Sequence, residues 1–331
     1  MEASLISHRQ RLEDCLAGKV PDKTPVALWR HFPVDDQTPQ GLARAVLDFQ
    51  KLYDFDLVKV TPSSSFCLKD WGVEDEWQGN PEGTRQYVKR VIHSPDDWST
   101  LKVLDPYQGA LGDQLTCLKL ICDELGPGVP VLQTIFNPLS QAKNLVGGTQ
   151  LLVHMRQYPV LVSAGLKVIA ETTRRFIEAA NKTGMAGIFY AVQHANYHLL
   201  SSEEYLHFGK SFDLEILEAT RANWLNILHL HGENVMFQQL SDYPVQVINW
   251  HDRETFPSLA EGKEIFPGVV CGGLQRDRTM ELGSPEHVHS EARDAILSTG
   301  NQRFILGTGC VLQTTTPAAN IRAAIQAARH G

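Results

Sequence analysis

Eight short apolar runs, rich in β-branched residues, recur along this chain and are separated by segments with helical periodicity. Strands that are apolar throughout are typical of a parallel sheet, because helices cover both faces of such a sheet. Eight strands alternating with helices over 331 residues predict a single (β/α)8 barrel domain spanning residues 1–331. A doubly wound open sheet is the alternative. The predicted strands lie at residues 25–29, 57–60, 131–135, 187–191, 224–230, 245–250, 268–272 and 303–307.

Helical patterns fill most of the intervals between these runs. Residues 41–53 place their apolar side chains on one stripe, and residues 161–181 form a long amphipathic stretch. Ser201 and Glu204 have the spacing of a capping box, which predicts a helix over residues 202–222. Two further helices are predicted at residues 285–299 and 317–329, where proline follows Ser or Thr at the helix start.

Residues 71–106 interrupt the alternation of strands and helices. A turn-forming Gly-Asn-Pro-Glu-Gly stretch precedes a strand-like run at residues 86–92. We therefore expect a small β-hairpin after the second strand, followed by an inserted helix at residues 117–124. Because loops after barrel strands carry the site, we expect both near the barrel mouth.

Charge and composition narrow the classes of function. The chain has 30 basic and 38 acidic residues and a formal charge of −8, which disfavours nucleic-acid binding. No apolar run approaches the roughly 18 residues that a membrane span needs, and residues 1–15 are too polar for the core of a secretion signal. Six sparse cysteines without a CxxC spacing are expected to be reduced. These features predict a cytoplasmic protein with no nucleic-acid or membrane partner.

Polar and titratable side chains gather after the predicted strands, where barrel enzymes carry their sites. His229 and His231 stand two apart on the fifth strand, so both imidazoles face the same side. A thiolate from Cys310, after the eighth strand, would complete a three-ligand zinc site with an open position. The alternative is two histidines hydrogen-bonded to backbone or substrate, with Cys310 as a packed thiol.

A second histidine pair, His194 and His198, would share one face if that segment were helical, because the two residues stand four apart. The intervening residues are Ala-Asn-Tyr, so the glutamate of the metalloprotease motif is missing. We therefore expect these two histidines to line a substrate pocket or the surface.

Several stretches near these strand ends carry a family resemblance. They are residues 18–26 (GKVPDKTPV), residues 55–60 (FDLVKV) and the closing Gly-Thr-Gly-Cys at residues 307–310, followed by Thr316, Pro317 and Asn320. The chain resembles the uroporphyrinogen decarboxylase superfamily, which includes cobalamin-linked methyltransferases, over nearly its whole length. The resemblance implies a (β/α)8 barrel with its site at the carboxyl ends of the strands.

The residues that genuine decarboxylases use are largely missing. Their Arg-Gln-Ala-Gly-Arg motif corresponds here to Arg-His-Phe-Pro-Val at residues 30–34, which keeps at most the first arginine. Their aspartate after the second strand falls near Thr61-Pro62, and the histidine of their Gly-His-Gly segment is replaced by Thr308. A tetrapyrrole with many carboxylates needs several cations, so we do not expect this substrate.

The methyltransferase branch is more similar. Its members carry His-x-Cys after the fifth strand and a second cysteine after the eighth, and these residues hold zinc. His229 takes the first place, His231 stands where the family has its first cysteine, and Cys310 takes the place of the second. The resemblance therefore implies Zn²⁺ at these three residues, in a less electron-rich donor set than the family's. His251 or Asn249 would supply a fourth ligand.

The other strand-end residues receive roles from their chemistry. Glu233 and Asp252 are candidate catalytic proton acceptors, and Arg30 is a candidate catalytic partner of a substrate carboxylate. An ordinary ion pair at the barrel rim is the alternative for each of these three. The predicted substrate-binding residues are Arg30, His31, Gln193, His194, Asn249 and Gln275.

The sequence is compatible with three functions. The first is a zinc-dependent methyltransferase-like enzyme that activates a small substrate. Its methyl group would come from a separate corrinoid protein, because the chain lacks an Asp-x-His-x-x-Gly cobalamin motif. The second is a metal-independent decarboxylase that uses Arg30 and histidines on a carboxylated small molecule. The third is a non-catalytic small-molecule-binding barrel, and a homodimer is compatible with all three.

Overall fold

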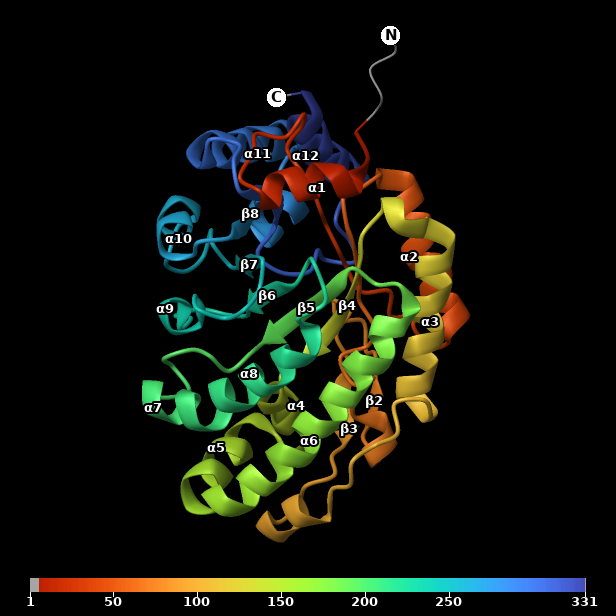
Figure 1. The fold of residues 1–331 in the computed structure, drawn as a ribbon, viewed down its shortest axis with the longest axis vertical. Helices are drawn as coiled ribbons and strands as arrows, with labels where there is room; N and C mark the ends of the chain where they lie inside the picture. The colour runs from red at the N-terminus through yellow and green to blue at the C-terminus, as the bar shows by residue number, and fades with distance from the viewer. Residues whose placement is uncertain (1–5, 331) are drawn as a thin grey trace.

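Seven parallel strands form one curled sheet in the computed structural model, which describes residues 6–330 (Figure 1). The sheet order is β1-β4-β5-β6-β7-β8-β9, so each strand pairs with the next strand of this sheet along the chain, as in a barrel. All residues of these strands are buried, as their apolar composition predicts. The bounds are β1 (Val58–Val60), β4 (Val131–Phe136), β5 (Gly187–Val192), β6 (Ile227–Leu230), β7 (Val247–Trp250), β8 (Val269–Leu274) and β9 (Phe304–Thr308).

The eighth place in the barrel belongs to the extended segment at residues 25–30, which forms isolated bridges rather than a regular strand. Val26 pairs in parallel with Leu306 of β9. On its other side, the Val26 N–H donates to the Asp56 carboxylate at 2.8 Å, and the Val26 carbonyl accepts from the Asp56 N–H at 2.9 Å. This segment is irregular for two reasons. Pro25 has no N–H to donate, and the Val26 N–H bonds to the side chain of Asp56 instead of to a backbone carbonyl. The predicted barrel fold is confirmed, with this one strand irregular.

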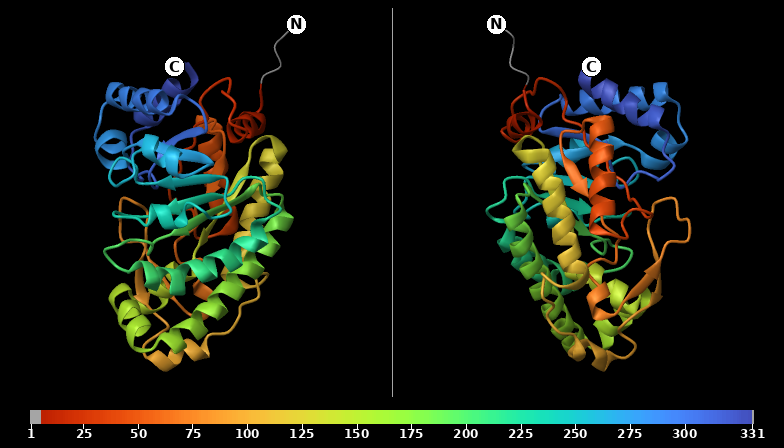
Figure 2. Two further views of the ribbon diagram at one scale, coloured as in Figure 1. Left: turned by 60° about the vertical axis from the view of Figure 1, so that its left-hand side comes forward. Right: turned by 90° about the vertical axis from the view of Figure 1, so that its right-hand side faces the viewer.

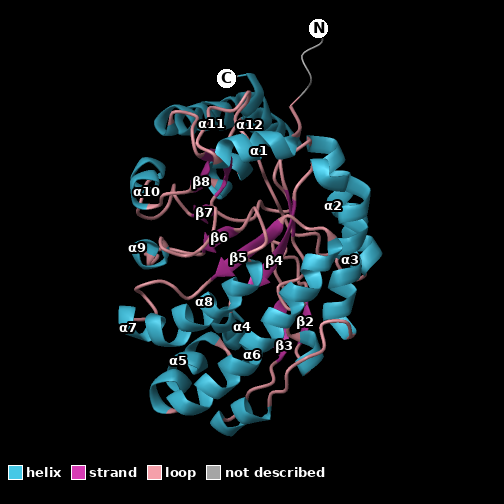
Figure 3. Ribbon diagram, viewed as in Figure 1, coloured by secondary structure: helices cyan, strands magenta, loops and turns pink. Residues whose placement is uncertain are grey.

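Helices surround the sheet (Figure 3). The predicted helix at residues 202–222 begins with its capping box and is then divided into α7 (Ser202–Tyr205), a π-helical turn (Leu206–Lys210) and α8 (Ser211–Leu217). Four helices lie where the sequence predicts them: α2 (Pro39–Tyr53), α6 (Pro159–Ala180), α11 (Pro285–Thr299) and α12 (Ala318–His330). The remaining helices are α1 (His8–Leu16), α3 (Gly109–Leu125), α4 (Pro138–Val146), α5 (Gly148–Gln157), α9 (Phe237–Leu240) and α10 (Leu259–Ile265).

Among the described helices, none is both long and apolar enough to cross a lipid bilayer.

The predicted excursion after the second barrel strand is confirmed as a two-stranded antiparallel hairpin of β2 (Glu74–Glu76) and β3 (Gln86–Lys89). Its loop is tied to the loops that follow β8 and β9. The Pro81 carbonyl accepts from the Thr314 N–H at 2.7 Å, and Glu82 forms an ion pair with Arg276. The hairpin therefore covers part of the barrel mouth.

The prediction of an inserted helix near the barrel mouth is wrong about where that helix lies. The residues concerned belong to α3, which runs beside α2 along the flank of the barrel (Figures 1 and 2). This is the ordinary position of the helix that follows the second barrel strand. The buried apolar stripe of α3, which includes Leu111, Leu118 and Ile121, explains why it packs there.

A buried carboxylate joins both ends of the described chain to the irregular barrel segment. Asp56 accepts from Arg11 Nη1 at 2.6 Å, and Arg329 Nη1 lies 3.1 Å from its Oδ2. His8 Nδ1 lies 2.9 Å from Asp56 Oδ1. Burial alone would raise the pKa of Asp56, but His8 and the two guanidinium groups lower it below its ordinary value. Helices α1 and α12 are thus held at the same end of the barrel (Figure 1).

Candidate functional site

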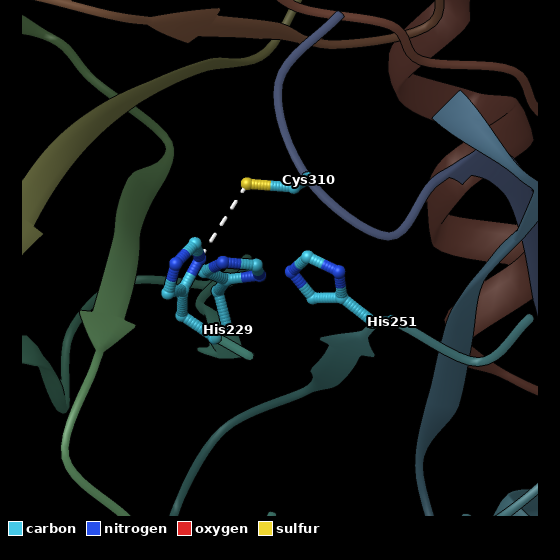
Figure 4. A group of neighbouring side chains, drawn as sticks. His229, His251 and Cys310 are labelled. Atoms are coloured by element: carbon cyan, nitrogen blue, oxygen red, sulfur yellow. Dashed lines mark hydrogen bonds between the residues drawn. The ribbon is translucent and has the colours of Figure 1, made fainter. Parts of the chain in front are cut away.

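Three histidines and one cysteine meet at the carboxyl ends of β6, β7 and β9. His229 and His231 come from the end of β6, His251 follows β7, and Cys310 follows β9. One potential ligand atom from each residue lies within 4.8 Å of the others, and Cys310 Sγ is 3.6 Å from His231 Nδ1. Figure 4 shows the imidazoles of His229 and His251 beside the Cys310 sulfur. The structure therefore brings the three predicted metal ligands together with His251, one of the two residues predicted as a fourth ligand.

Asn249 determines the orientation and tautomer of His229. Its Nδ2 donates to the carbonyls of Cys271 at 2.9 Å and Thr308 at 3.0 Å. Its Oδ1 must therefore be the acceptor for His229 Nδ1, which is 2.7 Å away. His229 Nδ1 carries the proton, and Nε2 keeps its lone pair. Asn249 is therefore a hydrogen-bond partner that orients His229, and it does not occupy a fourth ligand position.

Glu254 orients His251 in the same way. His251 Nδ1 donates to Glu254 Oε2 at 3.0 Å, and Glu254 Oε1 accepts from Gln275 Nε2 at 3.3 Å. The other ring nitrogen, His251 Nε2, is buried and has no hydrogen-bond partner within the described residues. A buried nitrogen of this kind needs an explanation, and a bound ion supplies one. Glu254 was not among the predicted residues, although its position three residues after a histidine could have indicated it.

The electrostatics of this cluster favour a thiolate. Burial opposes charge on sulfur, but contacts with His229, His231 and His251 lower the pKa of Cys310 well below its ordinary value. Burial lowers the pKa of His251, yet its contacts with Cys310 and Glu254 raise it to about 9. One thiolate with several imidazoles is a donor set typical of zinc. In a tetrahedral zinc site, one nitrogen and one sulfur ligand stand about 3.5 Å apart, close to the 3.6 Å between Cys310 and His231.

A cavity adjoins this cluster inside the barrel. His229, His231 and Cys310 line it, and Phe189 stacks on His229 with 5.3 Å between ring centres. The aromatic side chains of Trp29 and Phe136 also line the cavity. The candidate ligands therefore border a largely apolar space that a small molecule can occupy.

Two of the predicted substrate-binding residues, His31 and Gln193, line the cavity. Burial lowers the pKa of His31 to about 3, and its Nδ1 is buried without a hydrogen-bond partner among the described residues. His194 is buried outside the cavity lining, and burial also lowers its pKa to about 3. His198 is exposed because its segment is a turn rather than a helix, so the two histidines do not form a pair.

Arg30 does not line the cavity. Its guanidinium lies 5.1 Å from the ring centre of Phe32 and 5.6 Å from that of Phe49 in α2. The cause is the alternation of side chains along an extended segment, because Trp29 and His31 on either side of it face the cavity. The predicted roles of Arg30 in catalysis and substrate binding are therefore not supported by its position.

The two candidate proton acceptors also lie outside the cavity. Glu233 is exposed. Asp252 is buried, and its carboxylate accepts from the Gly273 N–H at 3.1 Å. Burial raises the pKa of Asp252 to about 7. Gln275 is not in the cavity lining either, since its side chain caps the helical turn at Arg276–Glu281.

Lys59 is the cavity residue that sequence reasoning missed. It comes from the centre of β1, and its Nζ donates to Thr61 Oγ1 at 3.1 Å. Burial is the main cause that lowers its pKa to about 7. A lysine within an otherwise apolar strand was the available signal, because such a charge is rarely buried without a reason.

The chain is similar to known proteins over most of its length. Residues 7–331 match the family described as Uroporphyrinogen decarboxylase (URO-D). Methylcobamide:CoM methyltransferase MtaA of Methanosarcina barkeri is 24% identical, with 96% of each chain covered. Methylcobamide:CoM methyltransferase MtbA of Methanosarcina acetivorans is 22% identical, over 73% of this chain and 70% of that protein.

A solved structure of a methyltransferase from Methanosarcina mazei has a TM-score of 0.84 at 20% identity, covering 97% of this chain and 98% of that one. A B12-independent methionine synthase from Shewanella sp. W3-18-1 has a TM-score of 0.57 at 13% identity, with 92% of each chain covered. At these identities the likeness shows the fold, and it agrees with the barrel described above.

Proposed function

The chain belongs to the uroporphyrinogen decarboxylase family, and from that premise we propose that it is a zinc-dependent methyltransferase acting on a small substrate. The observation that carries the proposal is the meeting of His229, His231, His251 and Cys310 beside a largely apolar cavity. Relatives named methylcobamide:CoM methyltransferases support the reaction class. The methyl donor would be a separate corrinoid protein, in line with the absence of a cobalamin motif from the sequence.

The four clustered residues would hold the zinc. When bound, the zinc would act as a Lewis acid that lowers the pKa of a substrate thiol or hydroxyl. Cys310 would supply the anionic ligand. Asn249 and Glu254 accept hydrogen bonds from Nδ1 of His229 and His251, which leaves the Nε2 atom of each ring for the zinc. Phe189 packs on one face of the His229 ring.

Methyl transfer tests this proposal directly. Zinc-loaded protein should transfer the methyl group of free methylcobalamin to a small thiol, measured by the absorbance change of the cobalamin. Protein stripped of zinc should be slower by at least about 100-fold, since Lewis-acid activation is worth several kcal/mol. Activity that is equal in stripped and reloaded protein would contradict the proposal, as would failure of the protein to bind zinc at all.

Removing the partner of His229 should weaken zinc binding without removing a ligand. Asn249→Leu is expected to lower the zinc affinity about 10- to 100-fold, because His229 loses the acceptor that fixes its ring. Competition with a chromogenic chelator measures this change. The matched control is Asn226→Leu, since Asn226 is a buried asparagine at the opposite end of β6. Equal zinc affinities in the two variants would assign Asn249 a purely structural role.

Uroporphyrinogen should not be a substrate. Among the described residues, Lys59 is the one lysine or arginine that lines the cavity, since Arg30 lies against α2. Several carboxylates on one tetrapyrrole would lack partners, and unpaired buried charge is costly. A decarboxylation assay with uroporphyrinogen should therefore give no turnover above buffer, and turnover at the rate of a genuine decarboxylase would refute this prediction.

A further inference from the structure

We propose that Asp213, a buried carboxylate outside the cavity, is a positioning residue for the cavity wall. It acts through Asn137 and Ser140, which hold the backbone N–H of Gln193 where β5 ends. This connection involves none of the four clustered residues. Its effect on methyl transfer rests on the proposed function, because Gln193 lines the cavity in which a substrate would bind.

The carboxylate of Asp213 on α8 is fully buried and accepts four hydrogen bonds. Tyr190 Oη and Asn137 Nδ2 donate to its Oδ1 at 2.8 and 3.1 Å. Tyr205 Oη and Tyr243 Oη donate to its Oδ2 at 2.5 and 2.7 Å. Each oxygen therefore has two donors, which is the full capacity of an ionised carboxylate. Because the donors come from β5, from α7 and from the segments before α4 and after α9, these elements together fix the carboxylate.

Asp213 lies on the side of β5 that faces away from the cavity. Phe189 and Ala191 line the cavity, so strand alternation directs Tyr190, between them, to the opposite face. Asp213 bonds to β5 through this tyrosine, and it is not in the cavity lining. An effect of Asp213 on a bound substrate therefore depends on hydrogen bonds that continue to the cavity wall.

The hydrogen bonds between Asp213 and Gln193 have a single direction. Asn137 Nδ2 donates to Asp213, so Asn137 Oδ1 faces Ser140 and accepts from both its N–H, at 3.0 Å, and its hydroxyl. The single hydroxyl hydrogen is used there, and the Ser140 oxygen is left to accept the Gln193 N–H at 3.0 Å. With the Asn137 amide turned over, its NH₂ group would face both Ser140 donors. Asp213 stabilises the orientation that avoids this conflict.

Helix α4 holds Gln193 at two points. Ser140 accepts its backbone N–H, and Lys143 Nζ donates to its side-chain Oε1 at 3.4 Å. Ser140 and Lys143 stand three apart on α4, so they share one face of the helix. A shift in the first turn of α4 would therefore move Gln193, and with it this part of the cavity wall.

Amide hydrogen exchange, followed by NMR on metal-free protein, tests the connection independently of the reaction. Ser140→Ala deletes the acceptor and is expected to speed exchange of the Gln193 N–H about 5- to 10-fold, the effect of one hydrogen bond. Asp213→Asn replaces one acceptor oxygen with an NH₂ group and should speed this exchange by a smaller factor. In the double variant, Asp213→Asn should add nothing to the effect of Ser140→Ala, because Asp213 acts through Ser140.

Thr173→Val is the matched control. It removes a buried hydroxyl that bonds to Gln141, the neighbour of Ser140, and should leave exchange at Gln193 unchanged. Unchanged exchange at Gln193 in Ser140→Ala would overturn the proposal, whether or not Asp213→Asn folds. Effects that multiply in the double variant, or a change in Thr173→Val as large as that in Ser140→Ala, would overturn it as well.

Steady-state methyl transfer from free methylcobalamin to 2-mercaptoethanol then measures the effect on the cavity. Ser140→Ala should raise the KM for the thiol about 5- to 10-fold and keep the wild-type kcat and zinc content, because only substrate binding is weakened. Absence of methyl transfer in the wild type would refute the proposed function alone. Methyl transfer with an unchanged KM in Ser140→Ala would refute the positioning role alone.

Discussion

Cys310→Ala is expected to lower the zinc affinity by more than about 100-fold, because loss of a ligand should exceed the 10- to 100-fold effect of losing a supporting partner. Cys310 is the only anionic donor in the cluster, and three histidines lower the pKa of its thiol. Without its charge, a divalent ion would be held by neutral imidazoles alone. Zinc content after dialysis against a weak chelator, followed by competition titration, measures the change.

Cys271→Ala is the matched control for this substitution. Cys271 is also a fully buried cysteine of the barrel, and burial raises the pKa of its thiol, so it stays protonated. It is not among the four clustered residues. Cys271→Ala should therefore keep wild-type zinc content even if it lowers the free energy of unfolding. Equal zinc retention by both alanine variants would remove Cys310 from the site.

Asp56→Ala is expected to lower the free energy of unfolding by about 3–5 kcal/mol, the range seen when one partner of a buried ion pair is removed. Asp56 is fully buried and is the shared partner of Arg11, Arg329 and His8. The alanine leaves these cations without that carboxylate and deletes the acceptor of the Val26 N–H. Urea unfolding followed by circular dichroism gives the change.

The neighbouring Asp54 provides the control for this effect. Its side chain is 76% exposed, and its Oδ1 lies 2.9 Å from His8 Nε2. Because exposed ion pairs contribute little, Asp54→Ala should change the free energy of unfolding by no more than about 1 kcal/mol. If Asp56→Ala were as mild as Asp54→Ala, the buried carboxylate would not be needed to hold α1 and α12 to the barrel.

The sequence predicts the barrel well because buried parallel strands must be apolar on both faces. That constraint is visible in each run, and it holds even for residues 25–30, where Pro25 and Asp56 replace regular strand pairing. The His229–His231 pair is predictable for a related reason, since strand alternation alone puts both rings on one side. The same alternation turns Arg30 to the side opposite Trp29 and His31, so the prediction that Arg30 binds substrate in the cavity is not supported.

Other parts of the site depend on tertiary contacts that no spacing contains. Asn249 supports His229 because its amide reaches carbonyls of two other strands, at Cys271 and Thr308. His251 joins the cluster because the turn after β7 brings Glu254 back onto its ring. Such contacts form only once the barrel curls, so the sequence shows the residue types without showing which of them meet.

X-ray absorption at the zinc K edge, combined with elemental analysis of freshly purified protein, tests the metal site most directly. The expected result is about one zinc per chain, with one sulfur neighbour at about 2.3 Å and nitrogen neighbours at about 2.0 Å. Cys310→Ala should lose the sulfur neighbour. Wild-type protein that contains no stoichiometric metal, or zinc surrounded by oxygen and nitrogen alone, would contradict a site formed by His229, His231, His251 and Cys310.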